Sequence, residues 1–127
     1  MRDNESPFAR LHVWRSAVDF GKQVYAATAK YPPEERFGLT AQTRRATVSV
    51  MANLAEGSSR RGPKAFAHFC QVAYGSLREV EALLIFGAEL GMLAAADALP
   101  LQQSLGSVSR QLYKLMRSLE EAAKKTS

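Results

Sequence analysis

The chain has 127 residues, of which 46% are hydrophobic and 23% charged, a balance typical of one soluble globular domain. Its longest uncharged apolar run, residues 82–88, is far shorter than the roughly 20 residues of a membrane-spanning helix. No secretory leader is recognisable at the start. The single cysteine, Cys70, excludes an internal disulfide and a cysteine-built metal cluster, and it favours a cytoplasmic location.

The net charge of +5 is compatible with a polyanionic partner, and it is unevenly distributed along the chain. Residues 65–100 hold one arginine against four carboxylates, whereas residues 101–127 hold five cations against two carboxylates. Residues 36–64 hold one carboxylate, Glu56, and six cations: Arg36, Arg44, Arg45, Arg60, Arg61 and Lys64. The positive charge is therefore concentrated in the second and the last quarters.

Four segments have the apolar spacing of amphipathic helices, and no segment alternates in the manner of a strand. The predicted helices cover residues 11–30, 41–56, 63–90 and 98–123. In the last of them a heptad seam comprises Leu101, Leu105, Val108, Leu112, Leu115, Leu119 and Ala122. Four such helices with short connections predict an all-α fold, an up-and-down antiparallel four-helix bundle, as one domain over residues 1–127.

Turn-forming and capping residues separate these helices. Thr40 is a predicted N-cap of the second helix, and Gly57 stands where a left-handed C-cap would end it. Pro63 suits the first turn of the third helix. Either Asp97 or Pro100 is expected to open the last helix.

The second helix carries a seam of small and polar residues where a bundle usually places bulky apolar ones. The seam comprises Gln42, Ala46, Ser49, Asn53 and Glu56. Buried polar groups need hydrogen-bond partners, and the third helix offers Ser76 and Glu79, with Gly75 permitting close approach. We therefore predict that Asn53 or Arg45 meets one of these two residues. The alternative is that the polar seam faces water at the edge of the bundle.

Three blocks of the sequence resemble a known bacterial family. They are "LHVWRSA" (residues 11–17), "YPPEERFGLTAQTRRATVSVMANLAEGSSR" (residues 31–60) and "FCQVAYGSLREVE" (residues 69–81). They are similar to the conserved blocks of four-helix-bundle proteins that are encoded within intervening sequences of bacterial 23S ribosomal RNA genes. A related branch is the accessory variability determinant of diversity-generating retroelements. The resemblance extends from Leu11 to about Leu119.

This resemblance implies a bundle that assembles into a barrel-like homopentamer. The retroelement branch binds nucleic acid and its reverse transcriptase through basic surface residues, whereas the role of the stand-alone members is not established. The matching positions are Gln42, Arg44, Arg45, Asn53, Glu56, Gly57, Gly75, Ser76 and Glu79. One position departs from the pattern: Tyr74 stands where the family often has a basic residue, which removes one possible phosphate contact.

Residue patterns typical of an enzyme are largely missing from the sequence. Neither His12 nor His68 stands three residues after a carboxylate, so the di-iron pattern of ferritin-like bundles is not present. Cys70 lies in an apolar stretch and is predicted to be a buried, inert thiol. Glu79 and Glu81 point to different helix faces and do not form a catalytic pair. We therefore predict no enzymatic activity, no metal and no cofactor.

The basic residues are the remaining functional signal. The predicted nucleic-acid-binding residues are Arg44, Arg45, Arg60, Arg61 and Lys64. The last three lie in or near one interhelix turn, about 20–25 Å along the helix axis from the first two. No stacking aromatics accompany the arginines, so binding is expected to follow backbone charge, with the choice between RNA and DNA open.

Several alternatives to nucleic-acid binding remain open at this point. The basic face can be solvated without a ligand, and Arg45 can form a structural pair with Glu79 or Glu56. A rival function is a protein-interaction module that recruits a partner such as a polymerase and does not contact nucleic acid. In either function the chain itself is the first expected partner, as a homo-oligomer, and no membrane is involved.

Overall fold

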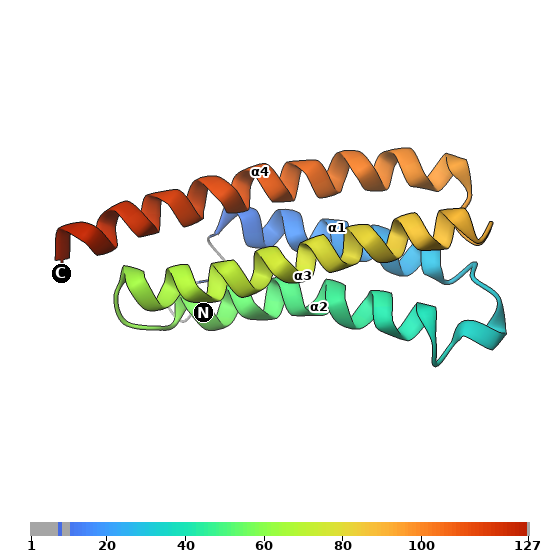
Figure 1. Cartoon of the computed structure of the whole chain (residues 1–127), viewed down its shortest axis with the longest axis horizontal. Coiled ribbons are helices and arrows are strands. Elements are labelled where there is room, and N and C mark those ends of the chain that lie inside the picture. Colours follow the sequence, from blue (N-terminus) through green and yellow to red (C-terminus); the bar gives the residue numbers. More distant parts are fainter. Residues whose placement is uncertain (1–7, 9–10, 127) are drawn as a thin grey trace, which may run out of the picture.

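The computed structural model describes Phe8 and residues 11–126, and within this part every regular element is a helix (Figure 1). The elements are α1 (His12–Thr28), a short 3-10 helix η3 (Pro33–Glu35), α2 (Leu39–Ser58), α3 (Pro63–Glu89) and α4 (Ala95–Thr126). The prediction of an all-α four-helix fold is confirmed.

Each helix packs against the helices that precede and follow it in the chain, and α4 also packs against α1. The helices therefore follow one another around the bundle, and the contact between α2 and α3 is the most extensive. Because each connection reverses the chain direction, one end of the bundle gathers the start of α1, the α2–α3 turn and the last turns of α4 (Figure 1). The last turns of α4 extend beyond that turn.

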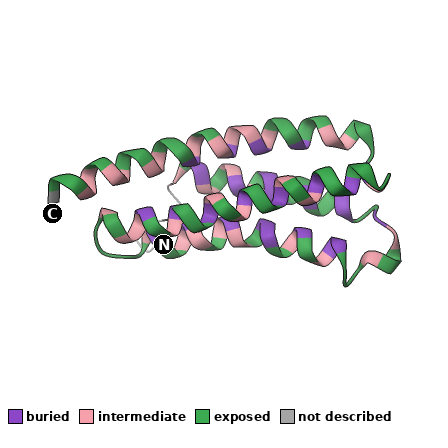
Figure 2. Ribbon diagram, in the orientation of Figure 1, coloured by how far each residue is buried: buried purple, intermediate pink, exposed green. Residues whose placement is uncertain are grey.

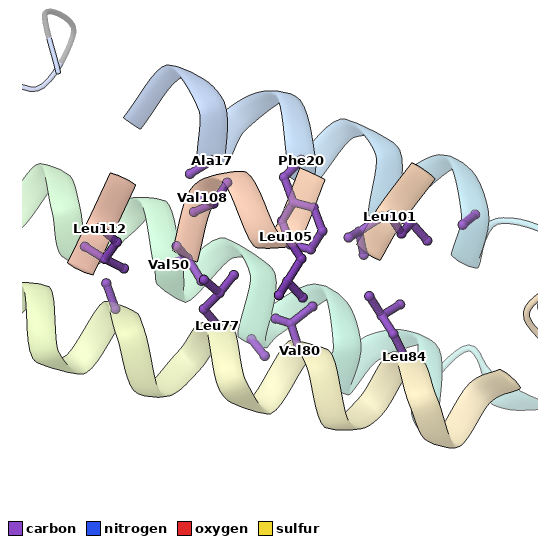
Figure 3. Close-up of a cluster of buried hydrophobic side chains, with 14 of the residues drawn as sticks. Ala17, Phe20, Val50, Leu77, Val80, Leu84, Leu101, Leu105, Val108 and Leu112 are labelled. Carbon is purple, nitrogen blue, oxygen red and sulfur yellow. The ribbon is translucent and has the colours of Figure 1, made fainter. Parts of the chain in front are cut away.

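The core is built from apolar side chains of all four helices (Figure 3). Its largest fully buried members include Phe20 of α1, Leu54 of α2, Leu77 of α3 and Leu112 of α4. Burial of such side chains contributes roughly 1.5–3 kcal/mol each, so this layer is the main source of stability.

The hydroxyl groups of three buried threonines form hydrogen bonds within their own helices. Thr28, Thr43 and Thr47 are at most 2% exposed, and each donates a hydrogen bond of 2.8 Å to the carbonyl four residues earlier. This local bond offsets the cost of burying a hydroxyl, so Thr43 and Thr47 occupy core positions through hydrogen bonds within their own helix.

The start of α2 differs from the prediction. Thr40 is buried within the helix, and the carboxylate of Glu35 accepts a hydrogen bond of 2.9 Å from the backbone N–H of Leu39. Glu35 therefore caps the first turn in place of Thr40, because a free helical N–H is satisfied equally well by a carboxylate from the preceding turn.

Of the predictions for the other helix ends, two are wrong and one is confirmed. Gly57 lies inside α2, which continues to Ser58, so it is not a left-handed cap. The α4 helix begins at Ala95, which places Asp97 in its first turn and Pro100 within it. Pro63 occupies the first turn of α3, as predicted. Among the described residues only Gly62 and Gly91 have positive φ, and they flank α3 at its two ends.

The polar seam of α2 is rotated away from the core. Gln42 and Glu56 are exposed, and Ser49 and Asn53 are half-buried on the side that meets α3. The core face of α2 carries instead Leu39, Thr40, Thr43, Ala46, Thr47, Val50, Leu54 and Gly57. The five positions thus divide: Ala46 is in the core, Ser49 and Asn53 lie between α2 and α3, and Gln42 and Glu56 face water.

The heptad seam of α4 is buried only over its first half. Leu101, Leu105, Val108 and Leu112 are at most 5% exposed. The remaining members, Leu115, Leu119 and Ala122, are half-buried. The last turns of α4 continue past the α2–α3 turn, where fewer neighbouring segments cover the helix (Figure 2).

Candidate nucleic-acid interface

The contact between α2 and α3 contains one polar bridge. The hydroxyl oxygens of Ser49 and Ser76 lie 2.8 Å apart, and the Asn53 amide donates to the Ser49 carbonyl at 2.8 Å and to its hydroxyl at 3.0 Å. Asn53 thus orients Ser49, and Ser49 meets Ser76. A polar contact does join the helices at Ser76, as predicted, but the predicted α2 partner is wrong: Ser49 makes the contact, and Asn53 acts through Ser49.

Replacing Asn53 with alanine is expected to lower the free energy of unfolding by about 1 kcal/mol, because the half-buried bridge loses the amide that orients it. Urea denaturation checks this value, with Gln42→Ala on the exposed side of the same helix as the control. A change at Asn53 no larger than the control's, within about 0.5 kcal/mol, contradicts the prediction.

Arg44 is held by the end of α1. Its Nε donates to the hydroxyl of Thr28 at 2.9 Å, and Nη2 donates to the carbonyl of Tyr25 at 3.1 Å. The guanidinium also lies 4.4 Å from the centre of the Tyr25 ring. A cation beside the last carbonyls of α1 is favoured by the helix dipole, so this arginine joins α2 to α1. Arg45, its neighbour, is exposed.

Arg60 makes two side-chain contacts at the α2–α3 turn. It forms an ion pair with Glu56 one helical turn earlier, and its guanidinium lies 5.0 Å from the centre of the Phe69 ring of α3. Arg61 and Lys64 are exposed at the same turn. The structure therefore brings Arg60, Arg61 and Lys64 together, and it places Arg44 and Arg45 in the other half of α2.

The fold gathers cations that lie far apart in the sequence. We call residues 12–20, 49–76 and 111–126 the basic end, since they are the helix halves nearest the α2–α3 turn. The basic end carries Arg15, Arg60, Arg61, Lys64, Lys114, Arg117, Lys124 and Lys125 against Asp19, Glu56, Glu120 and Glu121. Among the other described residues, seven cations oppose six carboxylates. Most of the net positive charge therefore belongs to one end.

Sequence reasoning missed the contribution of α4 to this end. Its cations were visible as a positive last quarter of the chain. Only the antiparallel path of α4 shows that this quarter returns to the α2–α3 turn (Figure 1). The charge of the two segments thus adds up on one surface.

A groove of about 430 Å³ separates α3 from α4. Its apolar floor includes Leu84, Leu101 and Leu105, and its lining at the end nearer the α2–α3 turn is polar. The polar lining comprises Arg78, Glu81, Ser109 and Arg110. Ile85, which lines the groove, is exposed, and Phe86, Leu90 and Leu99 are further exposed apolar side chains of α3 and α4. This surface suits association with another macromolecule.

The residues considered for catalysis are not assembled into a site. Burial raises the pKa of the fully buried Cys70 thiol to about 12, which keeps it protonated at neutral pH. His12 and His68 are both exposed. Within the described residues, no three side chains of the metal-binding types gather at one point.

A comparison with protein families gives a match over residues 9–114, to the family described as the 23S rRNA-intervening sequence protein. The chain belongs to this family. The match includes α1, α2, α3 and more than half of α4, and it ends before Arg117, Lys124 and Lys125. A search of curated proteins finds no match. Across the part of the chain that is described, no helix is both long enough and apolar enough to cross a bilayer.

For this member of the 23S rRNA-intervening sequence protein family, Tyr74 lies on α3 beside Arg78, whose guanidinium is 5.1 Å from the centre of its ring. The position that departs from the family pattern is thus occupied by an aromatic side chain next to a cation.

Proposed function

We propose that the chain acts in the cytoplasm as a non-enzymatic scaffold that binds the backbone of RNA or DNA through the basic end, as an accessory factor of ribonucleoprotein type. The observation that carries this proposal is the gathering of eight cations from α1, the α2–α3 turn and α4 at one end of the bundle. A polyanion binds such a surface by releasing counterions, without needing a pocket.

Within the basic end, Arg61 and Lys64 are the strongest candidates for phosphate contacts, since both are exposed at the turn. Arg60 contributes its charge beside them while it is held by Glu56 and Phe69. Arg45 is a separate, exposed cation on the other half of α2, and Arg44 is occupied by α1.

We also propose that the chain assembles into a homopentamer. The resemblance to the pentameric family supports this, and so do the apolar part of the groove and the half-buried seam at the end of α4, which further burial against another copy would stabilise. A ring would repeat the basic end around its axis, which suits the repeated charges of nucleic acid. The mass of the purified oligomer in sedimentation tests this.

The double charge reversal Arg61→Glu/Lys64→Glu is expected to weaken binding at least tenfold, because two phosphate contacts become repulsive. The measurement is fluorescence anisotropy with a labelled 20-base-pair duplex and the matching single strand, at several salt concentrations. For the wild-type chain, log affinity for the duplex is expected to fall with log salt by about 0.9 per neutralised phosphate.

The matched control is Lys22→Glu/Arg36→Glu, which changes the charge equally at exposed positions outside the basic end. We expect this control to bind within about twofold of the wild-type chain, apart from the general effect of net charge at low salt. Absence of binding by the wild-type chain at low salt would remove the proposal, as would equal losses in both double variants.

A second candidate function is recruitment of a protein partner without nucleic acid. The groove between α3 and α4 favours it, because exposed Ile85, Phe86 and Leu90 continue its apolar lining along α3. A partner captured from cell extract that survives nuclease treatment and is lost with Ile85→Glu would support this function over the first.

A further inference from the structure

Two tyrosines on adjacent helices lie beside arginines on the α3–α4 face. The Arg78 guanidinium lies 5.1 Å from the centre of the Tyr74 ring, and Arg117 Nη1 donates to the Tyr113 hydroxyl at 3.4 Å. Tyr113 is 50% exposed and Tyr74 is half-buried. These aromatics were not apparent as a group in the sequence, because almost 40 residues separate them.

One hydrogen bond sets the register between the two helices. Arg78 Nη2 donates to the hydroxyl of Ser109 at 3.1 Å, so these two residues lie opposite each other. Tyr74 lies four residues before Arg78 on α3, and Tyr113 lies four residues after Ser109 on α4. Because α3 and α4 run antiparallel, both steps lead one helical turn toward the same end of the bundle. The two tyrosines therefore occupy matching levels on the two helices, on the side of the groove toward the basic end.

Cations accompany the tyrosines along α4. Arg110, Lys114 and Arg117 follow one another at spacings of four and three, which places them on one stripe of the helix. Arg110 lines the groove beside Arg78, and all three cations are exposed. A row of cations thus runs alongside two aromatic rings.

This combination is typical of surfaces that bind single-stranded nucleic acid. Unpaired bases stack on aromatic side chains, while neighbouring cations contact the backbone. Stacking does not require a particular base, since every base has a π-face. The duplex form offers no free base faces, so aromatic contacts distinguish single strands from duplexes.

We propose that the α3–α4 face from Arg78 to Arg117 binds single-stranded nucleic acid. Bases stack on the exposed ring of Tyr113, and Arg110, Lys114 and Arg117 contact phosphates, while Tyr74 holds Arg78 beside them. Arg78 has a positioning role, because Glu81, Ser109 and the Tyr74 ring already hold it. The inference rests on the proposed function and extends it from backbone charge to contact with bases.

The test compares Tyr113→Ala and Tyr113→Phe with the wild-type chain, by anisotropy with a labelled 15-nucleotide oligo-dT, a 15-nucleotide oligo-rU and a 15-base-pair duplex. The alanine variant is expected to bind the single strands at least tenfold more weakly and the duplex within twofold, with the salt slope unchanged. The phenylalanine variant keeps the ring and is expected to bind all three probes as the wild-type chain does.

Phe37→Ala is the matched control, since this side chain is 84% exposed and lies on the α1–α2 connection, away from the basic end. It is expected to leave binding unchanged, and the melting temperature of each variant verifies folding. Two outcomes overturn this site and leave the proposed function standing: equal single-strand affinities for Tyr113→Ala and the wild-type chain, and wild-type binding to the duplex alone. If the wild-type chain binds none of the three probes, the site and the proposed function are both overturned.

Discussion

Replacing Gly57 with alanine is expected to lower the free energy of unfolding by about 1–2 kcal/mol, which is the cost of overpacking less the gain that alanine brings within a helix. An added Cβ would lie 2.7 Å from Cβ of Phe69 and 2.9 Å from a ring carbon of Phe66, both on α3. The nearer atom is attached directly to the backbone of α3, so relief requires α2 and α3, the most extensively packed pair of helices, to separate near their connecting turn. Overpacking of this kind typically costs 1–3 kcal/mol.

Gly75→Ala is the control for this prediction. An added Cβ there would meet no described heavy atom within 4 Å. Because this glycine is exposed within a helix, alanine is expected to raise the free energy of unfolding by about 0.5–1 kcal/mol. Urea denaturation of both variants measures the difference. Equal stability of the two variants would mean that α3 adjusts freely around Gly57 and that close approach is not the reason for this glycine.

Removal of the Arg44 side chain is expected to destabilise the chain by about 2 kcal/mol. Arg44→Ala loses two charge-assisted hydrogen bonds to the end of α1 and the contact with the Tyr25 ring. The Thr28 hydroxyl still donates to Val24, which limits the loss. Thermal unfolding followed by circular dichroism provides the measurement.

Two comparisons make this result specific. Arg44→Lys is expected to recover little stability, because an ammonium group cannot reproduce the forked contact with the hydroxyl, the carbonyl and the ring. Arg45→Ala, at the exposed neighbour, is expected to change stability by less than about 0.5 kcal/mol. A small effect of Arg44→Ala, similar to that of Arg45→Ala, would show that the α1 contact contributes little.

The fold class was accessible from the sequence because helical spacing and turn chemistry agree in all four segments. Pro63 marked the start of α3 correctly, and the left-handed Gly91 follows its end. The remaining helix ends were less accurate. Glu35 caps α2 from the preceding 3-10 turn, a contact that depends on how the chain bends between Pro33 and Leu39.

Which side of each helix faces the core was harder to predict than the helix itself. On α2, Thr43 and Thr47 occupy the core because their hydroxyls bond to the helix's own carbonyls, so polarity did not reveal burial. The seam around Ser49 was recognised as unusual, with contact to α3 and exposure to water both open; Ser49 makes the contact. Its exposed members, Gln42 and Glu56, have no sequence feature that separates them from the half-buried ones.

The candidate interface was only partly predictable for a topological reason. The cluster of Arg60, Arg61 and Lys64 is local, and the sequence shows it directly. The meeting of that cluster with the cations of α4 depends on the direction of the last helix. The different positions of Arg44 and Arg45 depend on rotation about α2, since adjacent residues differ by about 100° around a helix.

The unequal charge of the two halves of the bundle has a consequence for encounter rates. The electrostatic field of such a molecule extends about 8–10 Å into a solution of physiological salt concentration. A nearby polyanion is therefore expected to orient the bundle before the two surfaces touch. For the proposed nucleic-acid partner, most productive collisions are expected to begin at the basic end. Association is therefore expected to slow with added salt much more than dissociation accelerates.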